Sequence, residues 1–168
     1  RAIGYRSGGY NMRNTAILAL TPQKGPGPYD QEEATTTEFG IKKSLGRGKI
    51  NFSYFSTELT DMQRVLNEAG AAGPVQYIKN TGDASMSGME LDLVYMLKNE
   101  IVVNLNVGTL NAKYDSVTYD ITGDGAIDFN EYDLALPRAA DLTYSAGLSK
   151  DFNVGTWSAN GRVSYSYR

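Results

Sequence analysis

Residues 157–168 read WSANGRVSYSYR, and every second side chain in this stretch is polar. The positions between them are apolar, aromatic or small, namely Trp157, Ala159, Gly161, Val163, Tyr165 and Tyr167. Successive side chains of a β-strand point to opposite faces of its sheet, so the pattern predicts one apolar face and one polar face. Transmembrane β-barrels need such strands, because alternate side chains face lipid and the lumen.

The same period of two recurs along the rest of the chain. In residues 89–95 the polar face carries Glu90 and Asp92, and residues 101–108 repeat the alternation. Weaker copies occupy residues 2–10, 37–42, 50–54 and 142–149. Together these runs predict an all-β fold, an antiparallel meander of about seven long strands.

Short and long connections alternate strictly between these runs. The short ones carry the Gly, Asn or Asp that tight turns use, at residues 45–48, 97–99 and 151–155. The long ones cover residues 11–35, 60–85 and 116–137. In an outer-membrane barrel the short turns face the periplasm and the long loops face the outside. The sequence therefore predicts three extracellular segments.

One long connection has two possible structures. Leu59, Met62, Val65 and Leu66 recur at helical spacing after a possible capping pair, which favours a short helix within residues 60–72. The alternative is that the strand continues above the membrane.

The composition excludes several functions. A net charge of -3, with scattered basic residues, gives no sign of a nucleic-acid partner. The chain has no Cys and no His, which excludes disulfides, thiolate metal sites and His-based catalytic triads. No apolar run approaches the ~20 residues of a transmembrane helix. We therefore predict that the segment is not an enzyme, and we name no catalytic and no cofactor-binding residue.

Five motifs carry a family resemblance. They are GYRSGGYN at 4–11, EATTTEFGIK at 33–42, SGMELD at 87–92, LNAKY at 110–114 and LPRA at 136–139. In this order and spacing they resemble successive landmarks of TonB-dependent outer-membrane receptors, most closely the siderophore or iron-complex type. The resemblance covers nearly the whole chain.

This resemblance implies a transport function. Such receptors have a barrel of about 22 strands, filled by an N-terminal plug domain, in the outer membrane of a Gram-negative bacterium. They import a scarce ligand with energy from TonB, and the resemblance to the siderophore group implies a ferric siderophore here. Residues 1–168 would be an internal fragment of the barrel without the plug, and hence an open sheet. The implied partners are outer-membrane lipid, the receptor's own plug domain, the TonB system through the plug, and the small-molecule ligand.

Residues 120–131 match the twelve-residue calcium loop of EF-hands and dockerins. Calcium takes six to eight oxygens, the glycine at position six permits a sharp turn, and the final glutamate can supply two oxygens. The candidate ligands are Asp120, Thr122, Asp124, Ala126 through its backbone carbonyl, Asp128 and Glu131. Thr122 stands where Asp or Asn is usual, and a strand precedes the loop. We therefore expect a structural calcium site that orders an extracellular loop. The alternative is a solvated acidic loop.

Two other functions stay open at this stage. A passive porin would share the alternation but would have no plug. A soluble or surface calcium-binding β-domain, such as an adhesin, would instead pack its apolar faces against one another in a sandwich.

Overall fold

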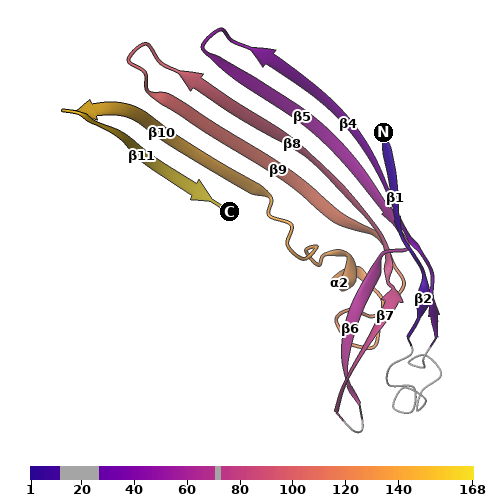
Figure 1. Cartoon of the computed structure of the whole chain (residues 1–168). Helices are drawn as coiled ribbons and strands as arrows, with labels where there is room; N and C mark the ends of the chain where they lie inside the picture. The colour runs from indigo at the N-terminus through magenta and orange to yellow at the C-terminus, as the bar shows by residue number, and fades with distance from the viewer. Residues whose placement is uncertain (12–26, 71–72) are drawn as a thin grey trace. The chain divides into compact units, whose positions relative to one another are not determined.

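The computed structural model describes residues 1–11, 27–70 and 73–168, and its largest element is a seven-stranded antiparallel sheet. The strand order is β1-β4-β5-β8-β9-β10-β11 (Figure 1). The strands are β1 Ala2–Arg6, β4 Glu32–Ser44, β5 Gly48–Thr60, β8 Gly82–Met96, β9 Val102–Val117, β10 Leu142–Val154 and β11 Trp157–Tyr167. The order is linear, so among the described residues the sheet is open. The predicted all-β meander is confirmed.

Small two-stranded ribbons lie at two of the predicted long connections, although the first ribbon begins with residues 9–10, inside the run predicted for residues 2–10. β2 (Gly9–Tyr10) pairs with β3 (Pro28–Tyr29), and β6 (Gln63–Gly70) pairs with β7 (Gly73–Asn80). The helix considered for residues 60–72 is therefore wrong, and the strand alternative is right. The third connection contains the helix α2 (Phe129–Tyr132). Residues 12–26 of the first connection lie outside the described residues.

The tight turns close as their sequences predict, with one exception. The Leu45 N–H donates to the Gly48 carbonyl at 2.8 Å, and Gly46 has a φ of 73°, which favours glycine. Between β10 and β11, however, strand pairing continues until Val154 faces Trp157. The turn predicted at residues 151–155 is therefore wrong for 151–154, because cross-strand pairing outweighs the local turn preference of Asp and Asn.

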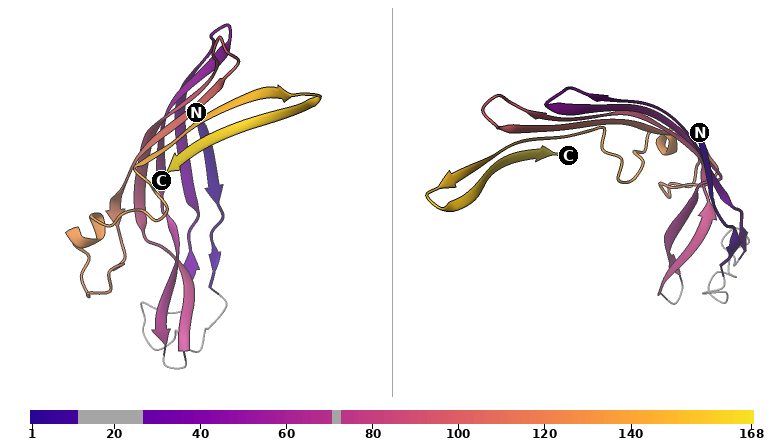
Figure 2. Two further views of the ribbon diagram at one scale, coloured as in Figure 1. Left: turned by 90° about the vertical axis from the view of Figure 1, so that its left-hand side faces the viewer. Right: turned by 45° about the horizontal axis from the view of Figure 1, so that its top comes forward.

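The chain divides into two compact units, which differ in where their apolar side chains lie. Unit 1 comprises Arg1–Thr36, Thr57–Ser85 and Lys113–Leu136; unit 2 comprises Thr37–Ser56, Met86–Ala112 and Pro137–Arg168. All buried hydrophobic residues of the described chain belong to unit 1, namely Met62, Tyr77, Ala84, Tyr114, Val117 and Leu136. Unit 2 contains strands of one sheet only, in a single layer (Figure 2). No helix in the described residues is long and apolar enough to span a membrane.

Side-chain amides hold the ribbons of unit 1 together. Asn11 accepts the Ile78 N–H at 2.8 Å and donates to the Ile78 carbonyl at 2.7 Å. Asn80 does the same with Asp30, accepting its N–H at 2.7 Å and donating to its carbonyl at 3.0 Å. Each amide thus makes the pair of hydrogen bonds that a strand residue would make, and it joins one ribbon to the other.

A buried glutamine completes this junction. Gln63 Nε2 donates to the carbonyls of Ser7 at 3.1 Å and Asp30 at 2.9 Å. The Gln63 N–H donates to a Glu32 carboxylate oxygen at 2.7 Å. Since buried polar groups need partners, this side chain fixes where β6 begins relative to the first ribbon.

Candidate functional site: a two-faced sheet and an acidic loop

In unit 2, the strand register gathers the apolar side chains of β9, β10 and β11 on one face. The cross-strand sets are Val107, Tyr144 and Tyr167; Leu105, Ala146 and Tyr165; and Val103, Leu148 and Val163. Directly opposite residues share a face, so these sets form one continuous surface, as the sequence predicted. Leu148 is 52% exposed and Val163 75% exposed. An apolar surface of this extent needs a partner that is not water.

The apolar surface extends to the β4–β5 hairpin. A Cβ on Gly40 would lie 3.8 Å from Ser53 Cβ, so these two residues are opposite one another. The next residues along the two strands, Phe39 and Tyr54, are therefore opposite one another on the apolar face, and both are exposed. Trp157, near the turn between β10 and β11, is 78% exposed. Exposed aromatic residues near strand ends are typical of the girdles at a membrane surface.

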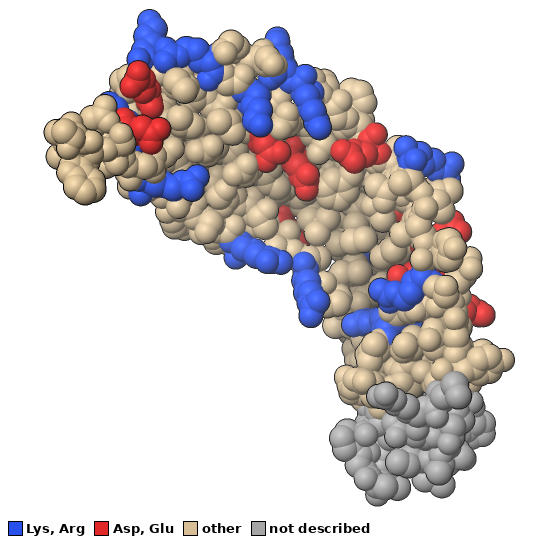
Figure 3. All heavy atoms as spheres, viewed as in Figure 1, with Lys and Arg blue, Asp and Glu red and all other residues tan. Residues whose placement is uncertain are grey.

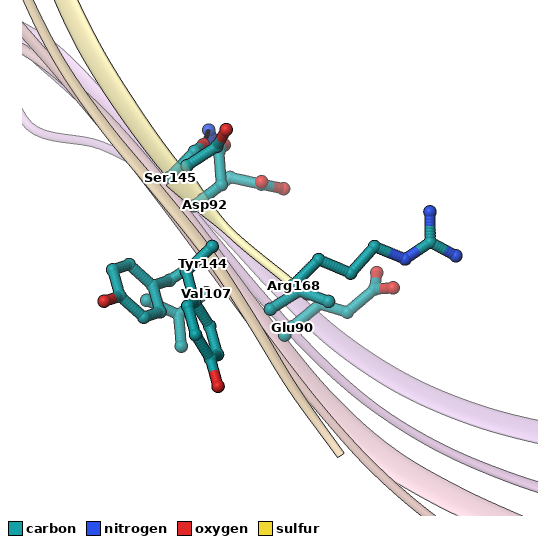
Figure 4. Close-up of a pocket in the computed structure, with 11 residues that line it drawn as sticks. Glu90, Asp92, Val107, Tyr144, Ser145 and Arg168 are labelled. Atoms are coloured by element: carbon teal, nitrogen blue, oxygen red, sulfur yellow. Dashed lines mark hydrogen bonds between the residues drawn. The ribbon is translucent and has the colours of Figure 1, made fainter. Parts of the chain in front are cut away.

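The opposite face of unit 2 is polar, and its residues, together with Val107, Tyr144 and Tyr167, line an open hollow of about 540 Å³. In Figure 4, Glu90, Asp92, Ser145 and Arg168 lie on one side of the strands, whereas Val107 and Tyr144 lie on the other. The hollow is lined by residues of four strands, among them Asn106, whose Nδ2 donates to Ser145 Oγ at 2.9 Å. Carboxylates, amides and a guanidinium on an open surface suit water or a polar partner. They do not form a nucleophile and base pair.

Asn160 and Arg162, two of the polar positions in the alternating run 157–168, lie on this polar face. Register pairs Ser149 with Arg162 and Asp151 with Asn160, whose Nδ2 donates to the Asp151 carboxylate at 2.6 Å. Sequence reasoning did not single out Arg168 as a lining residue. The signal was present, because Arg168 continues the polar positions of the final strand.

The acidic loop brings together part of the predicted calcium set. Carboxylate oxygens of Asp120, Asp124 and Glu131 lie within 4.8 Å of one another. The Thr122 hydroxyl lies beside them, donating to Glu131 Oε1 at 2.7 Å and within 3.2 Å of Asp120 Oδ1. Asp128 is not in this cluster, since its Oδ1 accepts the Asn130 N–H at 2.8 Å as the N-cap of α2. The structure thus groups three of the predicted carboxylates and the Thr122 hydroxyl.

Asp120 shapes the turn of this loop. Its two carboxylate oxygens accept the N–H groups of Gly123 at 2.6 Å and Gly125 at 2.8 Å. Gly125 has a φ of 94°, a backbone conformation that favours glycine, at the position where the calcium-loop pattern requires it. Ala126, the predicted carbonyl ligand, donates its N–H to Asp124 Oδ1 at 2.9 Å.

Glu131 is the one carboxylate of the cluster that is fully buried, at 0% exposure. The pKa of Glu131 is lowered, first by the backbone N–H of Asp128 and then by the Thr122 hydroxyl, while burial acts in the opposite direction. The residue is therefore held as a carboxylate beside Asp120 and Asp124. A group of negative charges held at this spacing suits a hard cation that prefers oxygen ligands.

The capping role of Glu131 was not predicted. Asp128 and Glu131 form a capping box at the start of α2, each accepting a backbone hydrogen bond from the other's position. The signal was in the sequence, because an acidic N-cap residue followed by Glu at the third helical position is the usual pattern.

Comparison with known proteins gives two matches. The family model described as TonB dependent receptor-like, beta-barrel matches residues 2–168. The crystal structure of the ferric yersiniabactin uptake receptor FyuA from Yersinia pestis is similar, with a TM-score of 0.69 and 16% identity over 98% of this chain and 22% of that chain. At this identity the likeness shows the fold alone, and it confirms the predicted barrel architecture. This chain spans 22% of the length of that receptor. No curated protein matches significantly.

Proposed function

Because this chain belongs to the TonB-dependent receptor family, whose β-barrels lie in the outer membrane of Gram-negative bacteria, we propose that it is part of an active importer. Unit 2 supplies barrel wall, with its apolar face toward lipid and its polar face toward the lumen. The ribbons and the acidic loop of unit 1 supply extracellular segments. The observation that carries this proposal is the family match over residues 2–168 together with the two-faced register of unit 2.

The proposed ligand is a ferric siderophore, taken up with energy from TonB through a plug domain. Two observations support this choice: the motifs resemble the siderophore group, and the similar structure is that of a ferric yersiniabactin uptake receptor. The lumen-facing residues Glu90, Asp92 and Arg168 would contact the plug or water. Ligand contacts are expected on the extracellular segments and on the plug.

The alternative functions are separated by different observations. A soluble β-domain would need a second sheet over the apolar face, and unit 2 has strands of one sheet only in the described part of the chain. A passive porin would have the same register, so only transport measurements separate it from an importer.

The decisive experiment measures uptake of iron-55 bound to candidate siderophores. Cells with the complete receptor should accumulate iron, whereas cells lacking the receptor or lacking TonB should not. Equal accumulation with and without TonB would show a passive pore and would contradict the proposal.

For the acidic loop we propose a calcium site built from Asp120, Thr122, Asp124 and Glu131. The carboxylates within 4.8 Å of one another support this proposal. Asp128 and the Ala126 carbonyl remain the further candidate ligands from the sequence pattern. A bound calcium ion would offset the negative charges and hold the loop in one conformation. Extracellular calcium modules bind with dissociation constants of roughly 10⁻⁴ to 10⁻³ M, which suits a structural ion.

Calcium binding can be measured on the intact receptor by terbium luminescence and its displacement by calcium, with nearby tyrosines as sensitisers. Glu131→Gln should weaken binding at least tenfold, because it removes a ligand that can supply two oxygens. Asp133→Asn is the matched control, since it removes one charge just outside residues 120–131. Equal affinity of the Glu131→Gln and wild-type proteins would dismiss the site.

A further inference from the structure

Two lysines lie on the apolar face of unit 2, where charged side chains are unexpected. In β10, Leu148, Lys150 and Phe152 occupy alternate positions, and Lys150 is opposite Gly161 of β11. Since Leu148 belongs to the apolar surface, Lys150 projects from the same side. Its partner Gly161 has no side chain, and the Phe152 ring lies 3.2 Å from the position that a Cβ of Gly161 would take. Lys150 therefore stands beside an aromatic ring on an apolar surface.

Lys43 occupies the corresponding place in β4. In the β4–β5 hairpin Gly40 is opposite Ser53, and the turn closes between Leu45 and Gly48. The same register makes Lys43 opposite Ile50. Lys43 follows the exposed Phe39 and Ile41 at intervals of two, so it shares their face.

Both lysines lie at the end of the sheet that carries the short turns. Lys43 precedes the turn of the β4–β5 hairpin by two residues. Ser149 pairs with Val102, so the next residue, Lys150, is opposite Ile101. The Ile101 carbonyl accepts the Leu97 N–H and so closes the turn of the β8–β9 hairpin. Neither lysine has a hydrogen-bond or ion-pair partner within the part of the chain that the structure describes.

The surroundings of the two lysines are strongly basic. Residues 42–50, 96–101 and 149–157 contain Lys42, Lys43, Arg47, Lys49, Lys98 and Lys150 but only two acidic residues, Glu100 and Asp151. Asp151 is engaged on the polar face by Asn160. Arg47 donates to the Leu97 carbonyl at 2.8 Å and so joins two neighbouring turns. Figure 3, in the view of Figure 1, shows basic side chains along the upper edge, where these two turns lie.

We propose that Lys43 and Lys150, the membrane-facing members of this basic rim, bind the anionic headgroups of phospholipids in the leaflet that faces the periplasm. A lysine rooted on an apolar surface lays its methylene stem along that surface and brings its ammonium group to the level of the lipid phosphates. A basic cluster at this depth attracts anionic headgroups over zwitterionic ones. Phe152 and the exposed Trp157 supply aromatic groups of the kind that settle at headgroup depth. The net positive charge of the rim and its position beside the apolar face favour anionic lipid headgroups as its binding partner.

The proposal rests on membrane location and on short turns facing the periplasm, not on ligand import. The experiment uses the complete receptor in detergent and counts bound phosphatidylglycerol or phosphatidylcholine by native mass spectrometry during titration. The variant Lys43→Gln/Lys150→Gln removes both membrane-facing charges. The matched control Lys42→Gln/Arg162→Gln removes two charges that lie next to them in sequence or register but on the polar face.

We expect the wild-type receptor to bind phosphatidylglycerol in preference to phosphatidylcholine. The Lys43→Gln/Lys150→Gln variant should bind phosphatidylglycerol about fivefold more weakly for each lysine removed, as expected for one basic side chain near an anionic surface. The control pair should bind like wild type, and Lys43→Arg/Lys150→Arg should keep the preference for phosphatidylglycerol. Equal loss in the Gln variant and in its control, or equal binding of the two lipids by wild type, would overturn the proposal. A folded-barrel band shift on unheated gels checks that each variant is assembled.

Discussion

Glu131 Oε2 accepts the backbone N–H of Asp128 at 2.9 Å, and this contact links the end of the acidic loop to the start of α2. The other oxygen of the same carboxylate accepts the Thr122 hydroxyl at 2.7 Å. Glu131 therefore closes the loop from both directions. Its ionisation should govern how well the loop is ordered.

The first prediction concerns pH. Because the pKa of Glu131 in the folded loop lies below its ordinary value of 4.5, the ionised form favours the folded loop. This stabilisation is fully present above the ordinary value and is lost as pH falls through the lowered pKa of the folded state. Hydrogen exchange of the Asp128 and Thr122 amides, followed by mass spectrometry without calcium, should show protection that falls below pH 4.5. In Glu131→Gln this pH dependence should be absent; if it persists, another group controls the loop.

The second prediction concerns the buried amide of unit 1. Gln63→Leu removes the donor that serves the Ser7 and Asp30 carbonyls and leaves both without that partner. We expect a local destabilisation of about 1–3 kcal/mol, seen as faster amide exchange in β6 and β7. Gln76→Leu is the control, because Gln76 is exposed and donates to Asn67 on the neighbouring strand. Similar exchange rates in the two variants would show that the junction does not depend on Gln63.

The third prediction concerns a close approach in unit 2. A Cβ on Gly88 would overlap the Thr109 carbonyl oxygen and lie 2.8 Å from the Phe55 ring. Gly88→Ala should therefore lower the fraction of receptor that assembles in the membrane, because backbone atoms of β9 would have to move. Gly4→Ala should assemble normally, since nothing lies within 4 Å of a Cβ there. The gel mobility of unheated samples reports the folded fraction.

The fourth prediction compares two neighbours on opposite faces. Leu105 lies opposite Ala146 on the apolar face, whereas Asn104 lies opposite Gly147 on the polar face. Leu105→Arg should cost roughly 2–4 kcal/mol of folding free energy in a bilayer, because it carries a charge into lipid. Asn104→Arg should cost much less, because its side chain reaches water. Urea titration of the receptor in phospholipid vesicles measures the difference, and equal costs would contradict the assignment of faces.

Much of the architecture could be predicted from the sequence because its signal is local. Alternation in residues 157–168 gives strand and face together, and a period of two cannot be met by a helix. Of the residues that the calcium-loop pattern named, the structure brings together Asp120, Thr122, Asp124 and Glu131 but not Asp128. Its carboxylate is used by the helix that follows, and a spacing pattern alone does not show that competition.

Other features depended on pairing with a neighbouring strand. Residues 151–154 carry turn-forming side chains, yet they are strand because β11 offers a continuous partner. Residues 60–72 carry apolar residues at helical spacing, yet β6 pairs with β7. In each case hydrogen bonding and packing against a neighbouring strand outweigh a local preference.

The alternation of polar and apolar residues was enough to predict the class of fold and which side chains share each face, because a strand residue takes its face from its position alone. The register between strands, the amide pairing of Asn11 and Asn80 and the burial of Glu131 became visible in the folded protein alone. The register and the amide pairing come from hydrogen bonds between residues far apart in the chain, whereas Glu131 is buried where the acidic loop folds around its hydrogen bonds to Asp128 and Thr122. Their free energy depends on which groups meet in the folded protein rather than on any one segment.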